Sequence, residues 1–229
     1  IFTPAEEIPF AGHPVLGASY VILRHTRRRK PARINLELSS GLIRTDIKKT
    51  DSTYRISMYQ PIPEFGSALQ NRGQVAKAFG LGRMELTGGG VVSNGLSFLI
   101  VEAENEESVK NAKLNTEKAL NIAERYNVCG IYLFSRVEKK KVDIHARFFA
   151  PALSVTEDAA TGSASGVMGG YMARILKFPR KLKLQIEQGV EMKRRSSIRV
   201  DVGCDRGLLE SVKVTGTVSH VGEGSIRVP

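Results

Sequence analysis

The stretch Ile8-Pro9-Phe10-Ala11-Gly12-His13-Pro14 has a counterpart far along the chain, Glu157-Asp158-Ala159-Ala160-Thr161-Gly162-Ser163. Each stretch follows a Phe-x-Pro tripeptide, Phe2-Thr3-Pro4 or Phe149-Ala150-Pro151, and each leads into a segment rich in small residues. The two copies lie roughly 150 residues apart in a chain of 229 residues. A unit that repeats at this spacing predicts two similar lobes that face each other across a cleft, each contributing one helix start.

Further landmarks repeat at nearly the same spacing. Leu36-Glu37-Leu38-Ser39-Ser40-Gly41-Leu42 matches Leu184-Gln185-Ile186-Glu187-Gln188-Gly189-Val190, apolar position for apolar position, and both pass through a glycine turn into a second strand. Tyr54-Arg55-Ile56-Ser57-Met58 then parallels Ile198-Arg199-Val200-Asp201-Val202. Strand, glycine turn and strand also recur by chance in β-rich proteins, but several landmarks in one order favour a duplicated unit.

The segment between the two copies has the patterns of ordered structure. Apolar runs bounded by turn residues predict strands at 96–101, 130–135 and 142–149. Apolar and small residues at helical spacing predict one helix over 106–126, and Asn105 is a suitable N-cap for it. These elements belong to the second copy of the unit.

The glycine run Gly88-Gly89-Gly90 lacks the spacing of a dinucleotide-binding fingerprint, and we interpret it as a linker between lobes. We therefore place an N-terminal lobe at residues 1–86 and a C-terminal lobe at residues 87–229. Only Ile1 precedes the first Phe-x-Pro tripeptide, whereas a long ordered segment precedes the second. The duplication thus predicts about 40–50 further residues upstream in the natural protein.

The composition sets outer limits on function. No run of eighteen apolar residues occurs, so we expect no membrane span. The only two cysteines, Cys129 and Cys204, have no metal-ligand spacing, which indicates neither a metal site nor a disulfide framework and fits a reducing cytoplasm. No phosphate-binding loop of the Walker type is present, and we expect no cofactor.

The net charge of +11 raises the question of nucleic-acid binding. Basic clusters lie at residues 27–30, 139–141, 180–181 and 193–195, at presumed helix ends and turns. The chain has no Trp, and aromatic residues do not alternate with the basic runs as a base-stacking surface requires. We interpret the clusters as solvated turns that help to attract an anionic substrate, and we do not expect nucleic acid as a partner.

The first stretch is suited to binding an acid group. Gly12 allows the backbone to approach a ligand closely, and Pro14 suits the first position of a helix. His13 then lies where free N–H groups and the positive end of the helix dipole bind carboxylates. An imidazole in this position can take or give a proton, although a packing or capping role is the alternative.

The second stretch has the same design. Thr161-Gly162-Ser163 starts a segment with apolar residues at helical spacing, and Asp158 precedes it. Asp158 and Ser163 each have an alternative role as a helix cap or turn residue. Placed opposite His13 by the repeat, they complete a site for proton transfer without a cofactor.

These residues also carry a resemblance to the phenazine-biosynthesis (PhzF-like) isomerase family. The matching motifs, which span essentially the whole chain, are Ile1-Phe2-Thr3-Pro4, Glu7-Ile8-Pro9-Phe10-Ala11-Gly12-His13-Pro14-Val15-Leu16-Gly17, Arg147-Phe148-Phe149-Ala150-Pro151, Glu157-Asp158-Ala159-Ala160-Thr161-Gly162-Ser163-Ala164 and Glu187-Gln188-Gly189. The resemblance implies the diaminopimelate epimerase-like α+β fold, with two pseudo-symmetric lobes that each wrap a mixed β-sheet around a central helix. Those helices would lie at about 14–23 and 163–175. It also implies a cofactor-independent isomerase that forms a homodimer.

The family's site residues carry over by motif. The resemblance makes His13 and Asp158 catalytic, and it assigns substrate binding to Gly12, Gly162 and Ser163. Ala159 stands where the family usually has proline. The family's principal proton-shuttling glutamate lies before the Phe-Thr-Pro tripeptide, where this chain has no match, so we expect the chain as given to be impaired in the family's chemistry.

The function expected from the residues and the resemblance is a proton shift within a small carboxylate-bearing metabolite. One alternative is an amino-acid racemase or epimerase, which uses a cysteine at the start of each central helix. Another is a non-catalytic protein on the same fold that binds nucleic acid or a protein partner.

Overall fold

The two predicted central helices are present in a computed structural model that describes residues 1–2, 7–26, 32–50, 53–139, 141–225 and 227. Helix α1 (Gly12–His25) and helix α5 (Gly162–Ile175) are both 14 residues long and begin at the two motif glycines. Most of α5 is buried because its small residues let the sheet pack closely around it. Thr3, Pro4 and the basic run at 27–30 lie outside the described residues.

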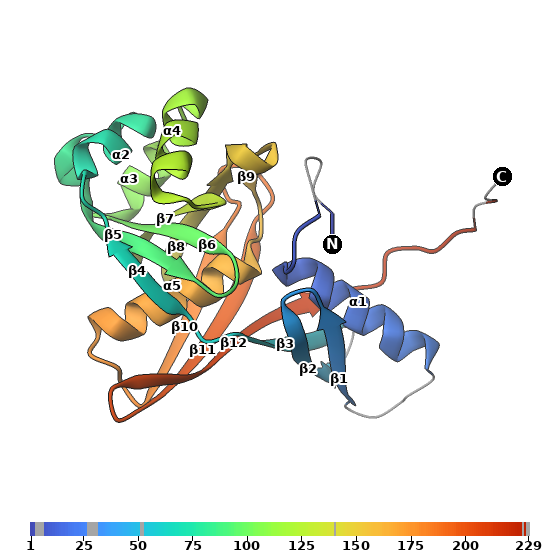
Figure 1. Cartoon of the computed structure of the whole chain (residues 1–229). Helices are drawn as coiled ribbons and strands as arrows, with labels where there is room; N and C mark the ends of the chain where they lie inside the picture. The colour runs from blue at the N-terminus through green and yellow to red at the C-terminus, as the bar shows by residue number, and fades with distance from the viewer. Residues whose placement is uncertain (3–6, 27–31, 51–52, 140, 226, 228–229) are drawn as a thin grey trace.

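Each central helix is followed by a three-stranded antiparallel meander. The first comprises β1 (Ala32–Leu38), β2 (Gly41–Lys49) and β3 (Tyr54–Gln60), and the second comprises β10 (Lys181–Gln188), β11 (Ser196–Asp205) and β12 (Leu208–Val218). Their order in the sheet is β1-β2-β3-β12-β11-β10, so the meanders join through an antiparallel pair of β3 and β12 (Figure 1). This arrangement has the pseudo-symmetry expected of the duplicated unit.

One proposed match between the copies is wrong in register. The segment from Tyr54 to Met58 opens β3, the third strand after α1, whereas Ile198 to Val202 lies in β11, the second strand after α5. The mismatch arises because the turn before β11 is much longer than the turn between β1 and β2, which shifts every later position.

The larger lobe adds further strands to the same sheet, together with three helices and two 3-10 turns. Its remaining strands are β4 (Glu64–Ala68), β5 (Leu86–Ser93), β6 (Ser97–Ala103), β7 (Gly130–Lys139), β8 (Val142–Ala150) and β9 (Val155–Asp158). Its helices are α2 (Arg72–Ala78), α3 (Glu106–Asn111) and α4 (Thr116–Tyr126), with a 3-10 turn at Arg83–Glu85 and another at Pro151–Leu153. Strand β6 is parallel to β7, and β8 is parallel to β10, which makes the sheet mixed.

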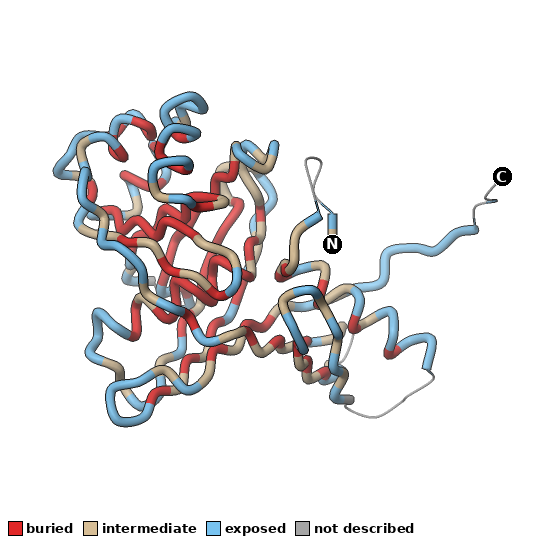
Figure 2. The backbone as a smooth tube through the Cα atoms, viewed as in Figure 1, coloured by how far each residue is buried: buried red, intermediate tan, exposed pale blue. Residues whose placement is uncertain are grey.

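Alternating residues of the central strands build two hydrophobic cores on opposite faces of the sheet. Phe98, Ile100 and Tyr132 pack towards α5, whereas Leu99 and Val101 pack towards α2, α3 and α4. Figure 2 shows this buried interior in the larger lobe, with the helices α2 to α4 covering its outer face. The strands predicted at 96–101, 130–135 and 142–149 are therefore confirmed as β6, β7 and β8.

The single helix predicted over 106–126 is instead two helices, α3 and α4. Asn105 is the N-cap as predicted, and its side chain accepts a hydrogen bond from the Ser108 N–H at 2.9 Å. The chain leaves the helix at Ala112, and the N–H groups of Lys113 and Asn115 donate to the carbonyls of Phe79 and Ala78, each at 2.8 Å. Hydrogen bonds to the end of α2 thus replace the helical hydrogen bonds of this segment. The helical spacing of the apolar residues could not reveal this break.

The interpretation of Gly88-Gly89-Gly90 as a linker is wrong, because these residues form part of β5. Gly89 has φ +156, and a Cβ atom there would lie 2.3 Å from the Ile100 carbonyl oxygen, so glycine is needed where the two strands approach. Strand β4 pairs with β5, and α2 packs on α4, so both elements associate with later residues. The lobe boundary between residues 86 and 87 stays a prediction.

Candidate active site

The starts of the two central helices touch each other. A Cβ atom on Gly12 would lie 2.8 Å from Gly162 Cα and 2.9 Å from the Ser163 backbone nitrogen. Neither helix has a side-chain hydrogen bond at its N-cap, Ala11 in α1 and Thr161 in α5. Free N–H groups and the positive dipole ends of two helices therefore converge at one place. The two motifs meet as the duplication predicts.

A cavity of about 220 Å³ opens at this contact. His13, Asp158 and Ser163 line it together with both glycines, so the structure brings all five predicted site residues together. His13 is exposed, Asp158 is half-buried and Ser163 is buried. The rest of the wall is mostly apolar, from residues including Phe10, Phe98, Phe148, Leu153 and Val155. The cavity thus combines an apolar body with a polar end at the helix starts.

The loop that leads into α5 is held by hydrogen bonds. The Thr161 hydroxyl donates to Asp158 Oδ2 at 2.7 Å. The Gln188 amide nitrogen donates to the Asp158 carbonyl at 2.7 Å and to the Thr161 hydroxyl at 3.0 Å, and its oxygen accepts from the Thr161 N–H at 3.3 Å. Because Gln188 is fully buried, these bonds fix the position of the Asp158 carboxylate. The turn role considered for Asp158 is therefore present alongside its place in the cavity.

Two amide side chains, one at the end of β3 and one in the turn between β5 and β6, hold the first turn of α5. Gln60 donates to the Gly162 carbonyl at 2.8 Å, and Asn94 donates to Gln60 Oε1 at 3.0 Å and to the Ser163 carbonyl at 3.2 Å. Gly166 makes room for them, because a Cβ atom there would lie 2.0 Å from Gln60 Oε1. Sequence reasoning missed both amides, since no local pattern distinguishes them.

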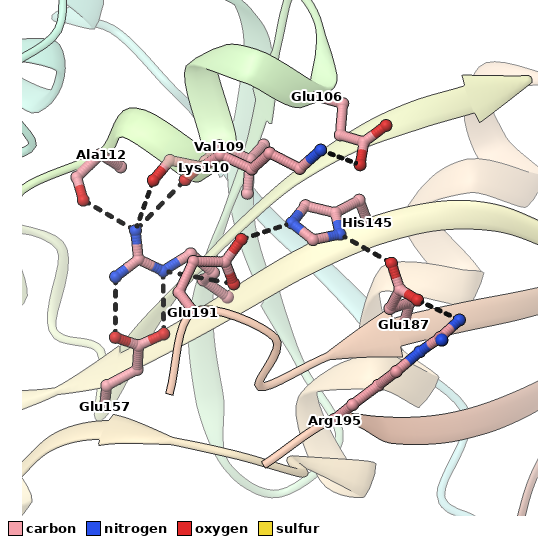
Figure 3. A network of polar contacts seen from close by, with 10 residues as sticks. Glu106, Val109, Lys110, Ala112, His145, Glu157, Glu187, Glu191 and Arg195 are labelled. Atoms are coloured by element: carbon pink, nitrogen blue, oxygen red, sulfur yellow. Dashed lines mark hydrogen bonds and ion pairs between the residues drawn. The ribbon is translucent and has the colours of Figure 1, made fainter. Parts of the chain in front are cut away.

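A buried ionic network lies behind this loop (Figure 3). His145 is fully buried, with Nδ1 3.3 Å from Glu187 Oε1 and Nε2 2.8 Å from Glu191 Oε1. Burial alone would raise the pKa of the Glu191 carboxyl, but the hydrogen bond from His145 and the charges of His145 and Arg147 leave that pKa below its ordinary value. Arg195 pairs with Glu187 from the outside.

Three potential metal ligands belong to the same network. Ligand atoms of Glu106, His145 and Glu187 lie within 4.8 Å of one another. Lys110 Nζ already lies 2.7 Å from Glu106 Oε1, and Arg195 pairs with Glu187. Because protein cations balance these carboxylates, ion pairing explains the cluster and we assign no metal to it.

The fold belongs to a class of two-lobed α+β architectures that epimerases and racemases also have. A hydroxyproline epimerase from Agrobacterium vitis has this fold, with a TM-score of 0.67 at 10% identity over 95% of this chain and 66% of that one. The predicted fold class is confirmed by this likeness and by closer ones.

A family model described as phenazine biosynthesis-like protein matches residues 1–224. The trans-2,3-dihydro-3-hydroxyanthranilate isomerase of Pseudomonas fluorescens is 31% identical over 227 residues, which is 99% of this chain and 77% of that protein. A phenazine biosynthesis protein of the PhzF family from Bacillus anthracis has a TM-score of 0.85 at 26% identity, over 99% of this chain and 79% of that one. The chain belongs to the phenazine biosynthesis-like (PhzF) family of isomerases, as its motifs predict.

No helix among the described residues has both the length and the apolar character needed to cross a membrane. The cytoplasmic location expected from the cysteine content and the homodimer implied by the resemblance stay predictions.

Proposed function

We propose that the protein moves a proton within a small carboxylate-bearing metabolite without a cofactor. The observation that carries this proposal is the contact between two helix starts that both lack a side-chain cap. Each helix N-terminus has a positive partial charge of about half a unit, and two of them favour an anion more than one does. Gly12, Gly162 and Ser163 would bind the acid group there.

The same donors support the chemistry at the neighbouring carbon. Removal of a proton next to a carboxylate builds enolate-like negative charge, which fixed N–H groups stabilise without reorganising. His13 and Asp158 both line the cavity and would orient the substrate and assist proton transfer. The apolar wall suits a carbon skeleton of modest size. The further glutamate that the resemblance places upstream stays a prediction.

The racemase alternative needs two cysteines at the helix starts, where this chain has His13 and Ser163. Cys129 does line the cavity, but Cys204 is buried in β11, a strand of the second meander, and does not line it. Since the sequence has only these two cysteines, a paired-thiol mechanism finds no support.

The proposal is tested by measuring how fast a substrate proton exchanges with solvent in the wild type and in site variants. The full-length protein is incubated in deuterium oxide with trans-2,3-dihydro-3-hydroxyanthranilate, which the name of the Pseudomonas relative gives as a substrate, and with a panel of small unsaturated and amino acids. We expect deuterium incorporation into at least one acid and a loss of about 100-fold or more in His13→Ala and in Asp158→Ala, since general acid–base groups contribute that much.

His25→Ala is the matched control, because His25 lies exposed at the far end of the same helix. Circular dichroism establishes that the variants remain folded. Turnover within threefold of the wild type in both site variants would contradict the mechanism.

A further inference from the structure

The turn between β10 and β11, residues 189–195, packs against the loop that carries Asp158. Gly189 has φ +76, and a Cβ atom there would lie 2.7 Å from the Ala159 carbonyl oxygen and 2.6 Å from that of Arg194. Only glycine tolerates this conformation and this approach. The turn and the active-site loop are therefore positioned as one unit.

The turn brings two arginines to the mouth of the site. A second cavity of about 400 Å³ is lined by His13, Asp158, Arg194, Arg195 and Ser196. His13 and Asp158 also line the apolar cavity, so they lie where the two spaces meet. A ligand held at the helix starts can thus extend past them towards the guanidinium groups.

The Arg195 side chain is 69% exposed, but its guanidinium group has a buried partner. It pairs with Glu187, whose side chain is 9% exposed, and Glu187 contacts the fully buried His145. The other ring nitrogen of His145 contacts Glu191, which belongs to the turn itself (Figure 3). Burying three ionisable groups is costly unless they are paired, so this anchor differs from a freely moving surface arginine.

Arg194 provides a charge that the network does not neutralise. It is exposed and makes no ion pair within the described part of the chain. The Asp158 carboxylate faces the same cavity and opposes a second anion there, and Arg195 already pairs with Glu187. A guanidinium group has five N–H donors, so both arginines retain donors for a second anion. Guanidinium groups bind carboxylates through two parallel hydrogen bonds, which provides selectivity as well as attraction.

We propose that Arg194 and Arg195 form a second anion-binding subsite, which makes the enzyme selective for substrates with two acidic groups. This inference rests on the proposed function, because the first acid group is the one held at the helix starts. The second group projects outwards through the opening between His13 and the turn.

Calorimetric binding to the full-length protein tests the subsite. The probes are the dicarboxylates succinate, glutarate and adipate, each compared with the monocarboxylate of equal chain length. We expect at least one dicarboxylate to bind about tenfold more tightly than its partner, as hydrogen bonds between charged groups provide. Arg194→Gln and Arg195→Gln should each abolish this preference and leave monocarboxylate binding within twofold.

Lys193→Gln is the matched control, because it removes one positive charge from the same turn and does not line the cavity. It should keep the preference. Arg194→Gln leaves the Glu187 pair intact, so its result does not depend on the stability of the network.

The outcomes separate the two proposals. Equal affinity for the dicarboxylate and the monocarboxylate of each pair would overturn the second subsite. A loss of the dicarboxylate preference in Lys193→Gln as large as in the arginine variants would overturn it too. In both cases, continued binding of monocarboxylates leaves the first site standing. A protein that binds neither kind of acid contradicts the proposed function and the subsite together.

Discussion

At the scale of single residues, the site depends on a missing side chain. A Cβ atom on Gly12 would lie 2.8 Å from Gly162 Cα, too close to be accommodated, whereas a Cβ atom on Gly162 would make an ordinary contact of 3.4 Å with Gly12 Cα. The requirement at Gly12 is steric, because this residue does not need a positive φ. Gly17, one and a half turns further along α1, has no atom within 4 Å of a Cβ position and is free of this constraint.

Gly12→Ala should therefore separate the helix starts. We expect a loss of about 1–3 kcal/mol in the free energy of unfolding, typical of overpacking, together with loss of carboxylate binding. Gly17→Ala, the control, should gain up to about 1 kcal/mol from better helix propensity and keep binding. Urea denaturation and calorimetry measure both. Equal stability and binding in the two variants would contradict the proposed contact.

At the scale of elements, one arginine joins a helix end to two strands. Arg147 of β8 donates to the Val109 carbonyl at 3.2 Å and to the Ala112 carbonyl at 2.7 Å, at the end of α3. It also donates to both carboxylate oxygens of Glu157 in β9, each at 2.8 Å. The guanidinium group thus donates to the free carbonyl groups at the C-terminus of α3, which a glycine C-cap motif usually satisfies.

Arg147→Met should destabilise the protein by about 3–5 kcal/mol, because it leaves Glu157 charged and the α3 carbonyls without this donor. Thermal and urea unfolding measure the change. The double variant Arg147→Met with Glu157→Met should recover part of the loss. Arg199→Met is the control: its ion pair with Asp201 is 46% exposed on the arginine side and should be worth at most about 1 kcal/mol. An equal effect of Arg147→Met and Arg199→Met would refute this role.

At the scale of the whole molecule, the cleft is set by one continuous sheet. Strands β3 and β12 pair across the two lobes, and the hydroxyls of Ser57 and Thr215 lie 2.8 Å apart at that junction. Figure 2 shows that buried residues concentrate in the larger lobe, whereas fewer segments of the smaller lobe are buried. The sheet junction and the helix contact together position the two halves of the site.

Carboxyls across the molecule make its stability depend on pH. Burial opposes the charged form of Asp46, Glu191 and Asp201, but hydrogen bonds and nearby cations leave the pKa of each below its ordinary value. Such groups stabilise the folded state above their unfolded pKa, and that stability is lost as pH falls through the folded pKa.

We therefore expect the free energy of unfolding to fall as pH drops from about 5 to about 3. Glu191→Gln should reduce stability at neutral pH and show a shallower acid dependence, because this carboxyl no longer contributes. Urea unfolding at several pH values measures both slopes. Parallel curves for the wild type and the variant would contradict the assignment.

Much of the site could be predicted, because its residues lie within two short motifs. His13, Asp158, Gly12, Gly162 and Ser163 were all placed in one cleft by the duplication alone. Their catalytic and binding roles stay predictions. By contrast, Gln60, Asn94, Gln188 and the two arginines of the 189–195 turn were missed or left without a role. The three amides each contact a residue more than twenty-five positions away, and the two arginines line a cavity together with His13 and Asp158. Only the tertiary structure reveals these contacts.

The sequence by itself determined the local elements and the duplication, since helix starts, strand alternation and glycine turns depend on neighbouring residues. Only the tertiary structure decided that residues 106–126 break into two helices and that the glycine run joins a strand. It also brought the 189–195 turn onto the Asp158 loop. Those outcomes follow from pairing between distant backbone segments, whose hydrogen bonds and close contacts outweigh local preference and leave no periodic trace in the chain.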